Sequence, residues 1–181
     1  MRFTLLIASI FIIVFTKQAF LQGGISKADN YFYGLELINA SESYQTIFQN
    51  HETNDDDRAL AGRKLAYISW HFYNDLDKAR EYVKKSLELE KYEAYLFKDL
   101  IDYEKESKNF EEAKKVYQQA ISKLKSDKKL NLVTAAYADM VLNEAFENIK
   151  QKQVLDTVIL NSAYQKIEIV NKKEPGKLKA A

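Results

Sequence analysis

The chain has no cysteine, one proline and five glycines in 181 residues. Without cysteine there can be no disulfide, no thiolate metal site and no cysteine nucleophile. Scarce proline and glycine favour long helices over a turn-rich all-β fold, and no useful length of strand-like alternation occurs. Hydrophobic residues make up 46% and charged residues 29%, which is typical of a chain that folds.

The sequence also lacks an excess of one charge. The formal charge is +1, and it becomes −1 if Arg2 and Lys17 are lost with the N-terminal segment. A near-neutral balance provides no electrostatic footprint for nucleic acid and argues against a strongly basic membrane-surface module.

The N-terminus resembles an export signal. A short basic start is followed by apolar residues 3–15, and Lys17 ends the run. This length suits a signal peptide and is short of the roughly 20 residues that span a membrane. The cleavage site is imperfect, since Leu21 would stand at position −1. We therefore expect 1–21 to be a signal peptide or an uncleaved anchor, with a buried helix of a cytosolic protein as the remaining interpretation. The predicted location is the periplasm or cell envelope of a bacterium.

Apolar residues recur at spacings of three and four over nearly all the remaining sequence, which predicts an all-α domain over 26–171. A flexible joint is expected at 22–26 and a flexible tail or truncated linker at 172–181. Asn54 or Asp55, Asp75 and Asn109 are expected to cap helices. About seven helices follow from the pattern: 28–50 with a break or kink near 39–41, 55–73, 75–87, 94–107, 109–124, 130–149 and 154–170.

Two segments of the chain are similar in sequence. Residues 75–87 align without a gap with residues 109–121, which lie 34 positions later. A fixed period of this size is typical of stacked helical hairpins, because one hairpin cannot bury its apolar face alone. We interpret the period as the mark of a binding scaffold.

The repeat resembles the tetratricopeptide repeat family. Two small residues flank a bulky one in each second helix, as in that family: Ala79, Val83 and Ser86, then Ala113, Tyr117 and Ala120. The preceding turns, 74–76 and 108–110, are also similar. The first helices match less well, since Tyr67 and Ile101 stand where a small residue is usual. The resemblance covers about 60–125 and implies a right-handed α-solenoid, with 28–50 and 130–170 as degenerate flanking units.

The resemblance also implies a concave groove lined by the first helices. The predicted partner-binding residues in this groove are Lys64, Ile68, His71, Phe72, Tyr95, Lys98, Asp102 and Lys105. Phe72 and Tyr95 are expected to be exposed anchors, whereas Phe97, Phe110 and Tyr117 are expected in the core. Ile68 and Asp102 stand where a carboxylate clamp would need asparagine, so a chaperone-type clamp is not expected.

Nothing in the sequence favours catalysis. His51 and His71 are interpreted as solvated or partly buried residues rather than metal ligands, and Asp55, Asp56 and Asp57 as acids at a helix start. No nucleotide-binding, zinc-protease or serine-hydrolase motif occurs.

We therefore expect a non-catalytic scaffold without metal or cofactor. It would bind a peptide or helix of a protein partner, and not nucleic acid or, beyond a possible N-terminal anchor, a membrane. An alternative is the N-terminal repeat region of a larger enzyme or regulator, or of a truncated version of one, which the linker-like residues 172–181 suggest. An all-α enzyme is a third interpretation.

Overall fold

The computed structural model describes residues 24–150 and 157–173, and these residues are all-α. They form eight helices and contain no strand: α2 (Gly24–Tyr33), α3 (Leu37–Gln49), α4 (Asp55–His71), α5 (Leu76–Leu87), α6 (Glu93–Glu106), α7 (Phe110–Lys123), α8 (Asp127–Lys150) and α9 (Thr157–Lys173). The predicted signal segment 1–21 and most of the predicted tail 172–181 lie outside the described residues. None of the helices described is long and apolar enough to cross a membrane.

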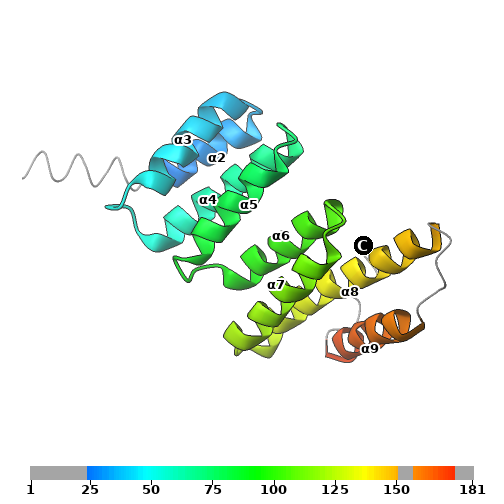
Figure 1. The fold of residues 1–181 in the computed structure, drawn as a ribbon. Coiled ribbons are helices and arrows are strands. Elements are labelled where there is room, and N and C mark those ends of the chain that lie inside the picture. The colour runs from blue at the N-terminus through cyan, green and yellow to red at the C-terminus, as the bar shows by residue number, and fades with distance from the viewer. Residues whose placement is uncertain (1–23, 151–156, 174–181) are drawn as a thin grey trace, which may run out of the picture. The chain divides into compact units, whose positions relative to one another are not determined.

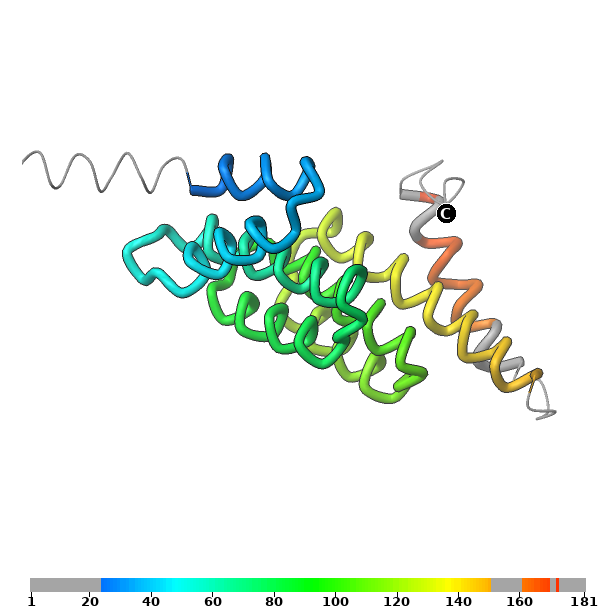
Figure 2. Tube along the Cα trace, turned by 90° about the horizontal axis from the view of Figure 1, so that it is seen from above, coloured from blue at the N-terminus to red at the C-terminus, as the bar shows by residue number. Residues whose placement is uncertain are grey.

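The chain divides into two compact units, Met1–Lys91 and Tyr92–Ala181. In the first unit, α3 packs against α2 and α4, and α4 forms a hairpin with α5 (Figures 1 and 2). In the second unit, α6 packs against α7 and α8, while α9 packs on α8. Two residues at the boundary, Glu90 and Tyr92, have positive φ angles of 55° and 53°.

The first helical region differs from the prediction. The chain breaks at Gly34–Glu36, and α3 then runs without interruption through 39–41. Leu35 adopts a left-handed conformation with φ of 61°, and the Glu36 N–H donates to the Tyr31 carbonyl, which ends α2. The prediction of a break near 39–41 was therefore wrong, and eight helices replace about seven. The predicted joint at 22–26 was also misplaced, because α2 already begins at Gly24.

Two of the three predicted helix caps are confirmed. Asn54 Oδ1 accepts from the Asp57 N–H at 2.9 Å, and Asp75 Oδ1 accepts from the Lys78 N–H at 2.9 Å. Asn109 precedes α7 but makes no side-chain cap. Its amide nitrogen instead donates to Glu104 Oε2 at 3.1 Å, because the Glu104 carboxylate is buried and needs donors.

The small and bulky residues of the repeat pattern lie in the cores of the two units. As the pattern predicts, six residues are at most 4% exposed: Ala79, Val83, Ser86, Ala113, Tyr117 and Ala120. In the first hairpin, Gly62 of α4 allows the close approach: a Cβ placed there would lie 2.1 Å from Ser86 Oγ and 2.6 Å from Phe48 Cε2. Ser86 satisfies its hydroxyl within α5 by donating to the Tyr82 carbonyl at 2.8 Å.

Candidate interaction surface

Helices α2 and α4 of the first unit present a group of aromatic side chains. Lys64, Tyr67 and His71 are spaced by three and four residues, so they follow one face of α4. The end of α2 brings two more rings beside them. We call this group the aromatic surface and define it as Phe32, Tyr33, Lys64, Tyr67, His71 and Phe72.

The rings of the aromatic surface contact one another. The centroid of Phe32 lies 5.4 Å from that of Tyr33 and 5.8 Å from that of Tyr67, both edge to face. Tyr67 in turn lies 4.2 Å from His71 and 6.2 Å from Phe72. Aromatic pairs at these separations are favourable, so the ring contacts favour the arrangement described here.

Lys64 joins the two helices of the surface. Its Nζ lies 4.6 Å from the Phe32 centroid and 5.1 Å from the Tyr33 centroid, and it donates to the Tyr33 hydroxyl at 3.5 Å. It is also 3.8 Å from Asp29 Oδ1. A cation over two ring faces beside a carboxylate is attracted to all three, so Lys64 acts mainly as a support for the rings.

Asp29 connects the surface to the core. The Tyr44 hydroxyl donates to Asp29 Oδ1 at 2.5 Å, and Tyr44 is fully buried. Burial, followed by the hydrogen bond to the Asp29 carboxylate, raises the pKa of the Tyr44 phenol well above its usual range. Tyr44 therefore stays protonated and holds Asp29 in place for Lys64.

Three of the predicted groove residues of this unit come together in the aromatic surface: Lys64, His71 and Phe72. Ile68 does not join them. Its side chain is 1% exposed in the core, so it is not accessible to a partner. The structure adds Phe32, Tyr33 and Tyr67, which the sequence analysis did not select. The signal available was Tyr67 itself, a bulky residue where the repeat family has a small one.

The other four predicted groove residues lie on α6 in the second unit. Tyr95 is 48% exposed. Lys98 pairs with Asp102 at 2.6 Å, and Lys105 lies 3.9 Å from the same carboxylate. Lys105 also pairs at 2.7 Å with Asp139 of α8, which the sequence analysis missed. These side chains therefore form a network of ion pairs that links α6 and α8.

The environment of Lys105 stabilises its charge. Burial disfavours the ammonium, but the hydrogen bond to Asp139 and the carboxylates of Asp102 and Glu106 outweigh it and raise the pKa of Lys105. Lys105 is therefore a structural cation that joins α6 to α8.

The histidines and acids considered as metal ligands have other partners. Arg58 donates to Asp55 Oδ1 at 2.8 Å and lies 3.3 Å from His51 Nδ1. Among residues 24–150 and 157–173, no three histidine or acidic side chains lie together so that they could hold a metal ion. The acids at 55–57 stand in the first turn of α4, where their negative charges interact favourably with the positive end of the helix dipole.

Comparison with known proteins adds no assignment. The chain matches no protein-family model, and no curated protein is significantly similar to it in sequence.

Proposed function

We propose that this protein is a non-catalytic scaffold that binds a peptide or helix of a protein partner through the aromatic surface. One observation carries the proposal: Tyr33, Tyr67 and Phe72 are 72%, 44% and 43% exposed although each touches another ring or Lys64. Exposed aromatic side chains leave apolar area in contact with water, and a partner that covers this area would gain hydrophobic free energy. Aromatic anchors also contribute strongly to binding at protein interfaces.

The proposed architecture is a tetratricopeptide-like α-solenoid. The period of 34 residues and the burial of the small residues at 79, 86, 113 and 120 support it. The proposed location is the bacterial periplasm or envelope, on the strength of the apolar segment 3–15 behind a basic start. A role without chemistry agrees with the lack of catalytic motifs in the sequence.

Affinity capture tests the proposal. Residues 22–181 serve as bait for the envelope fraction of the native organism, beside the variant Tyr67→Ala/Phe72→Ala. The matched control is Tyr164→Ala, which removes a ring that is 69% exposed on α9. We expect a protein retained by the parent and the control and lost by the double variant. Equal retention by all three baits, or by none, would contradict the proposal.

A further inference from the structure

Helix α9 packs on α8 in the second unit, and only a small part of α9 takes part in that contact (Figure 1). Among its described side chains, at 161–169 and 172, only Ala163 is buried. Tyr164 and Ile169 are 69% and 51% exposed. Helices in proteins are stabilised mainly by burial of an apolar face, so α9 is attached to α8 by a weak apolar contact.

One charged group attaches α9 to its neighbours. Lys166 Nζ lies 4.7 Å from the ring centroid of Tyr117 on α7 and 5.0 Å from that of Tyr137 on α8. The ion pair between Lys172 and Glu168 stays within α9. Among the described side chains, no hydrogen bond or ion pair joins α9 to α7 or α8. The polar attachment of α9 therefore depends on the contact of Lys166 with the two rings.

The two rings beside Lys166 keep their positions without help from α9. Tyr117 and Tyr137 stack with centroids 4.0 Å apart and an angle of 7° between the rings. The Tyr117 hydroxyl also shares a hydrogen bond of 3.1 Å with Thr134 of α8. These contacts join α7 to α8, so removal of α9 would leave the ring pair in place. The same rings can then attract another cation.

A second group on this side of α8 has an unused hydrogen-bond acceptor. Glu144 follows Tyr137 by seven residues, about two helical turns, so both side chains leave α8 on the same side. Glu144 is buried, and its Oε1 accepts from Lys114 Nζ at 2.9 Å. Its Oε2 is also buried and has no hydrogen-bond partner among the described residues. Buried polar atoms are normally paired, so this oxygen can accept from a donor that α9 does not supply.

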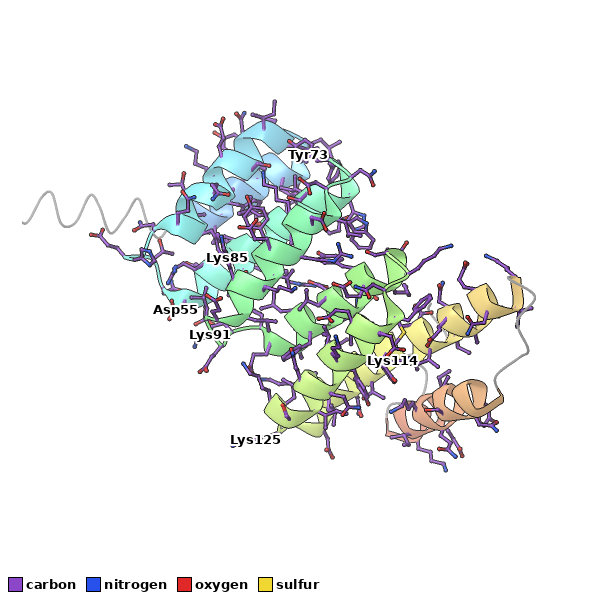
Figure 3. All side chains as sticks on the ribbon, viewed as in Figure 1. Asp55, Tyr73, Lys85, Lys91, Lys114 and Lys125 are labelled. Carbon is purple, nitrogen blue, oxygen red and sulfur yellow. The ribbon has the colours of Figure 1, made fainter. Side chains whose placement is uncertain are left out.

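The charges around Glu144 favour a cationic donor. Lys114, which Figure 3 labels on α7, pairs with Glu144 and also with Glu111 at 2.7 Å. One ammonium group thus faces two carboxylates. A buried carboxylate is stabilised by full pairing, so a further cation beside Glu144 would bind favourably. This side of α8 therefore attracts cations at two places, the ring pair and Glu144, and α9 supplies a cation only at the ring pair.

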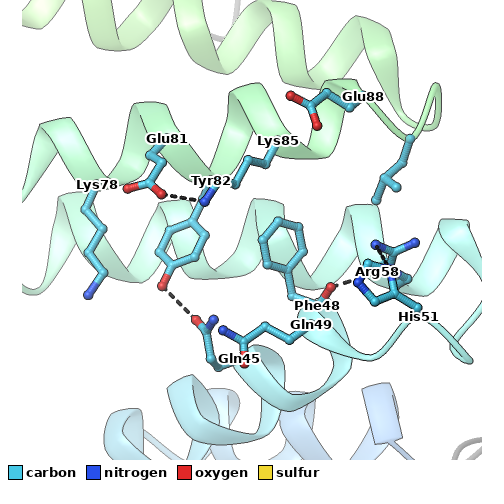
Figure 4. Close-up of a pocket in the computed structure, with 11 residues that line it drawn as sticks. Gln45, Phe48, Gln49, His51, Arg58, Lys78, Glu81, Tyr82, Lys85 and Glu88 are labelled. Carbon is cyan, nitrogen blue, oxygen red and sulfur yellow. Dashed lines mark hydrogen bonds and ion pairs between the residues drawn. The ribbon is translucent and has the colours of Figure 1, made fainter.

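A cavity of about 580 Å³ between α3 and α5 in the first unit shows no such unused group. The Tyr82 hydroxyl donates to Gln45 Oε1 at 2.7 Å, and Lys85 pairs with Glu81 at 2.6 Å (Figure 4). These side chains satisfy one another, so they do not indicate what ligand the cavity would take.

From these observations we infer that the side of α8 beneath α9 binds a basic helix of a partner protein, and that α9 is an internal ligand which this helix displaces. The partner helix places one Lys or Arg at the Tyr117–Tyr137 pair, where Lys166 lies, and a second one two turns away at Glu144. Its two cations compensate for the advantage that α9 has in being tethered to the site. This site lies in the second unit, and its test does not depend on the function proposed for the aromatic surface.

The first experiment tests whether α9 is a displaceable ligand. A fluorescein-labelled peptide of residues 157–173 is titrated against the full chain, and binding is followed by fluorescence anisotropy. Lys166→Glu in the chain should release α9, because it brings a carboxylate to a site that attracts cations, and Lys166→Met is a milder variant in case Lys166→Glu unfolds. We expect the peptide to bind either variant about tenfold or more tightly than the parent, since the tethered helix competes less. Lys172→Glu, which changes an exposed charge on α9, is the matched control and should behave as the parent.

The second experiment tests the chemistry of the partner. Helices joined by a short connection run antiparallel, and Lys166 lies at Tyr137, so the position two turns earlier in α9, that of Ile159, comes nearest to Glu144. The peptide with Ile159→Lys should bind the Lys166→Met chain about tenfold more tightly than the unchanged peptide, the effect of one charged hydrogen bond. Glu144→Gln in the chain should abolish that gain. A peptide with Gln165→Lys, which adds the same charge at an exposed position, is the control and should show no such gain.

Three results would overturn the inference. The first is equal affinity of the peptide for the parent and both Lys166 variants, or no binding to any of them, because α9 would then not be a ligand that can be replaced. The second is an equal gain from Gln165→Lys, which would reflect general charge attraction. The third is a gain from Ile159→Lys that persists in Glu144→Gln.

Discussion

Among single residues, Gly62 is closely confined: of the described glycines it leaves the least room for a side chain. Gly62→Ala would place a methyl group against Ser86 Oγ and the Phe48 ring, inside normal contact distance. We expect a loss of about 1–3 kcal/mol in the free energy of unfolding, as is usual for an overpacked core. Chemical denaturation measures it.

A second substitution separates the two contacts of Gly62. Ser86→Ala removes the oxygen at 2.1 Å but leaves the Phe48 ring at 2.6 Å. Gly62→Ala/Ser86→Ala should therefore recover part of the loss. If Gly62→Ala were as stable as the parent, α4 and α5 could not be as close as described.

Leu35 is another constrained residue, since a branched hydrophobic side chain occupies a left-handed conformation and is 73% exposed. Leu35→Gly should raise the free energy of unfolding by up to about 1 kcal/mol, because glycine adopts this conformation without steric cost. Asn74 has φ of 53° and is a residue type that tolerates it, so Asn74→Gly is the control with little expected change. A destabilised Leu35→Gly would show that this leucine makes a contact the protein needs.

The sequence predicted individual residues well where a repeated pattern constrained them. The small residues of the second helices are buried because the same spacing occurs twice. Gly62 occurs in one hairpin only, so no pattern marked it. Asn109 looked like a cap because its type favours that position, but the buried Glu104 carboxylate competes for its amide, and only the fold brings the two together.

At the scale of elements, α9 is held to the second unit by a cation above two rings. Tyr117 of α7 and Tyr137 of α8 stack with centroids 4.0 Å apart, and Lys166 of α9 lies 4.7 Å and 5.0 Å from them. The Tyr117 hydroxyl is fixed beneath by Thr134 at 3.1 Å. The Lys166 ammonium group of α9 thus contacts rings of both α7 and α8.

Lys166→Met should weaken the attachment of α9. The substitution keeps the apolar stem and removes the charge, at an expected cost of about 0.5–1 kcal/mol. Hydrogen exchange should become faster in α9 and remain unchanged in α6. Lys172→Met, which removes only an exposed pair with Glu168, is the matched control. Equal exchange in both variants would contradict a specific role for Lys166.

Element positions were predictable from apolar spacing, and the break between α2 and α3 was not. The period continues through Gly34–Glu36, so it gives no sign of a break there. The turn depends on Leu35 adopting a conformation that leucine rarely takes. Leucine disfavours the left-handed conformation that this turn requires. The packing of α2 on α3 outweighs that conformational cost.

For the molecule as a whole, buried tyrosines predict a stability limit at alkaline pH. Burial raises the pKa of Tyr44, Tyr82 and Tyr137 in the folded protein, whereas in the unfolded chain a tyrosine ionises near pH 10. Above that pH the unfolded state loses protons that the folded state keeps, so the free energy of unfolding falls as pH rises. Denaturation at a series of pH values from 8 to about 12 measures the slope.

Tyr44→Phe isolates the largest of these effects. It should be less stable at neutral pH, because Asp29 loses its donor, and its stability should fall less steeply above pH 10. A slope equal to that of the parent would show that Tyr44 does not contribute.

At the scale of the whole molecule, the prediction of an all-α chain is confirmed for the described residues, whereas the solenoid arrangement and the binding surface stay proposals. Helical spacing alone was sufficient for an all-α fold. The predicted groove residues divide between the two units, four in each, and the family pattern could not reveal that Ile68 is buried or that α6 lysines are paired. Such contacts depend on which helices meet, which a single sequence does not specify.

The chain has one tryptophan, Trp70, and its ring lies 4.1 Å from that of His71 in the aromatic surface. Indole emission responds to nearby imidazole and to exclusion of water. The protein thus carries its one indole fluorophore, which can be excited apart from its tyrosines, beside the surface where we propose a partner binds. Titration of any candidate partner can be followed by the wavelength and intensity of that emission, without a label.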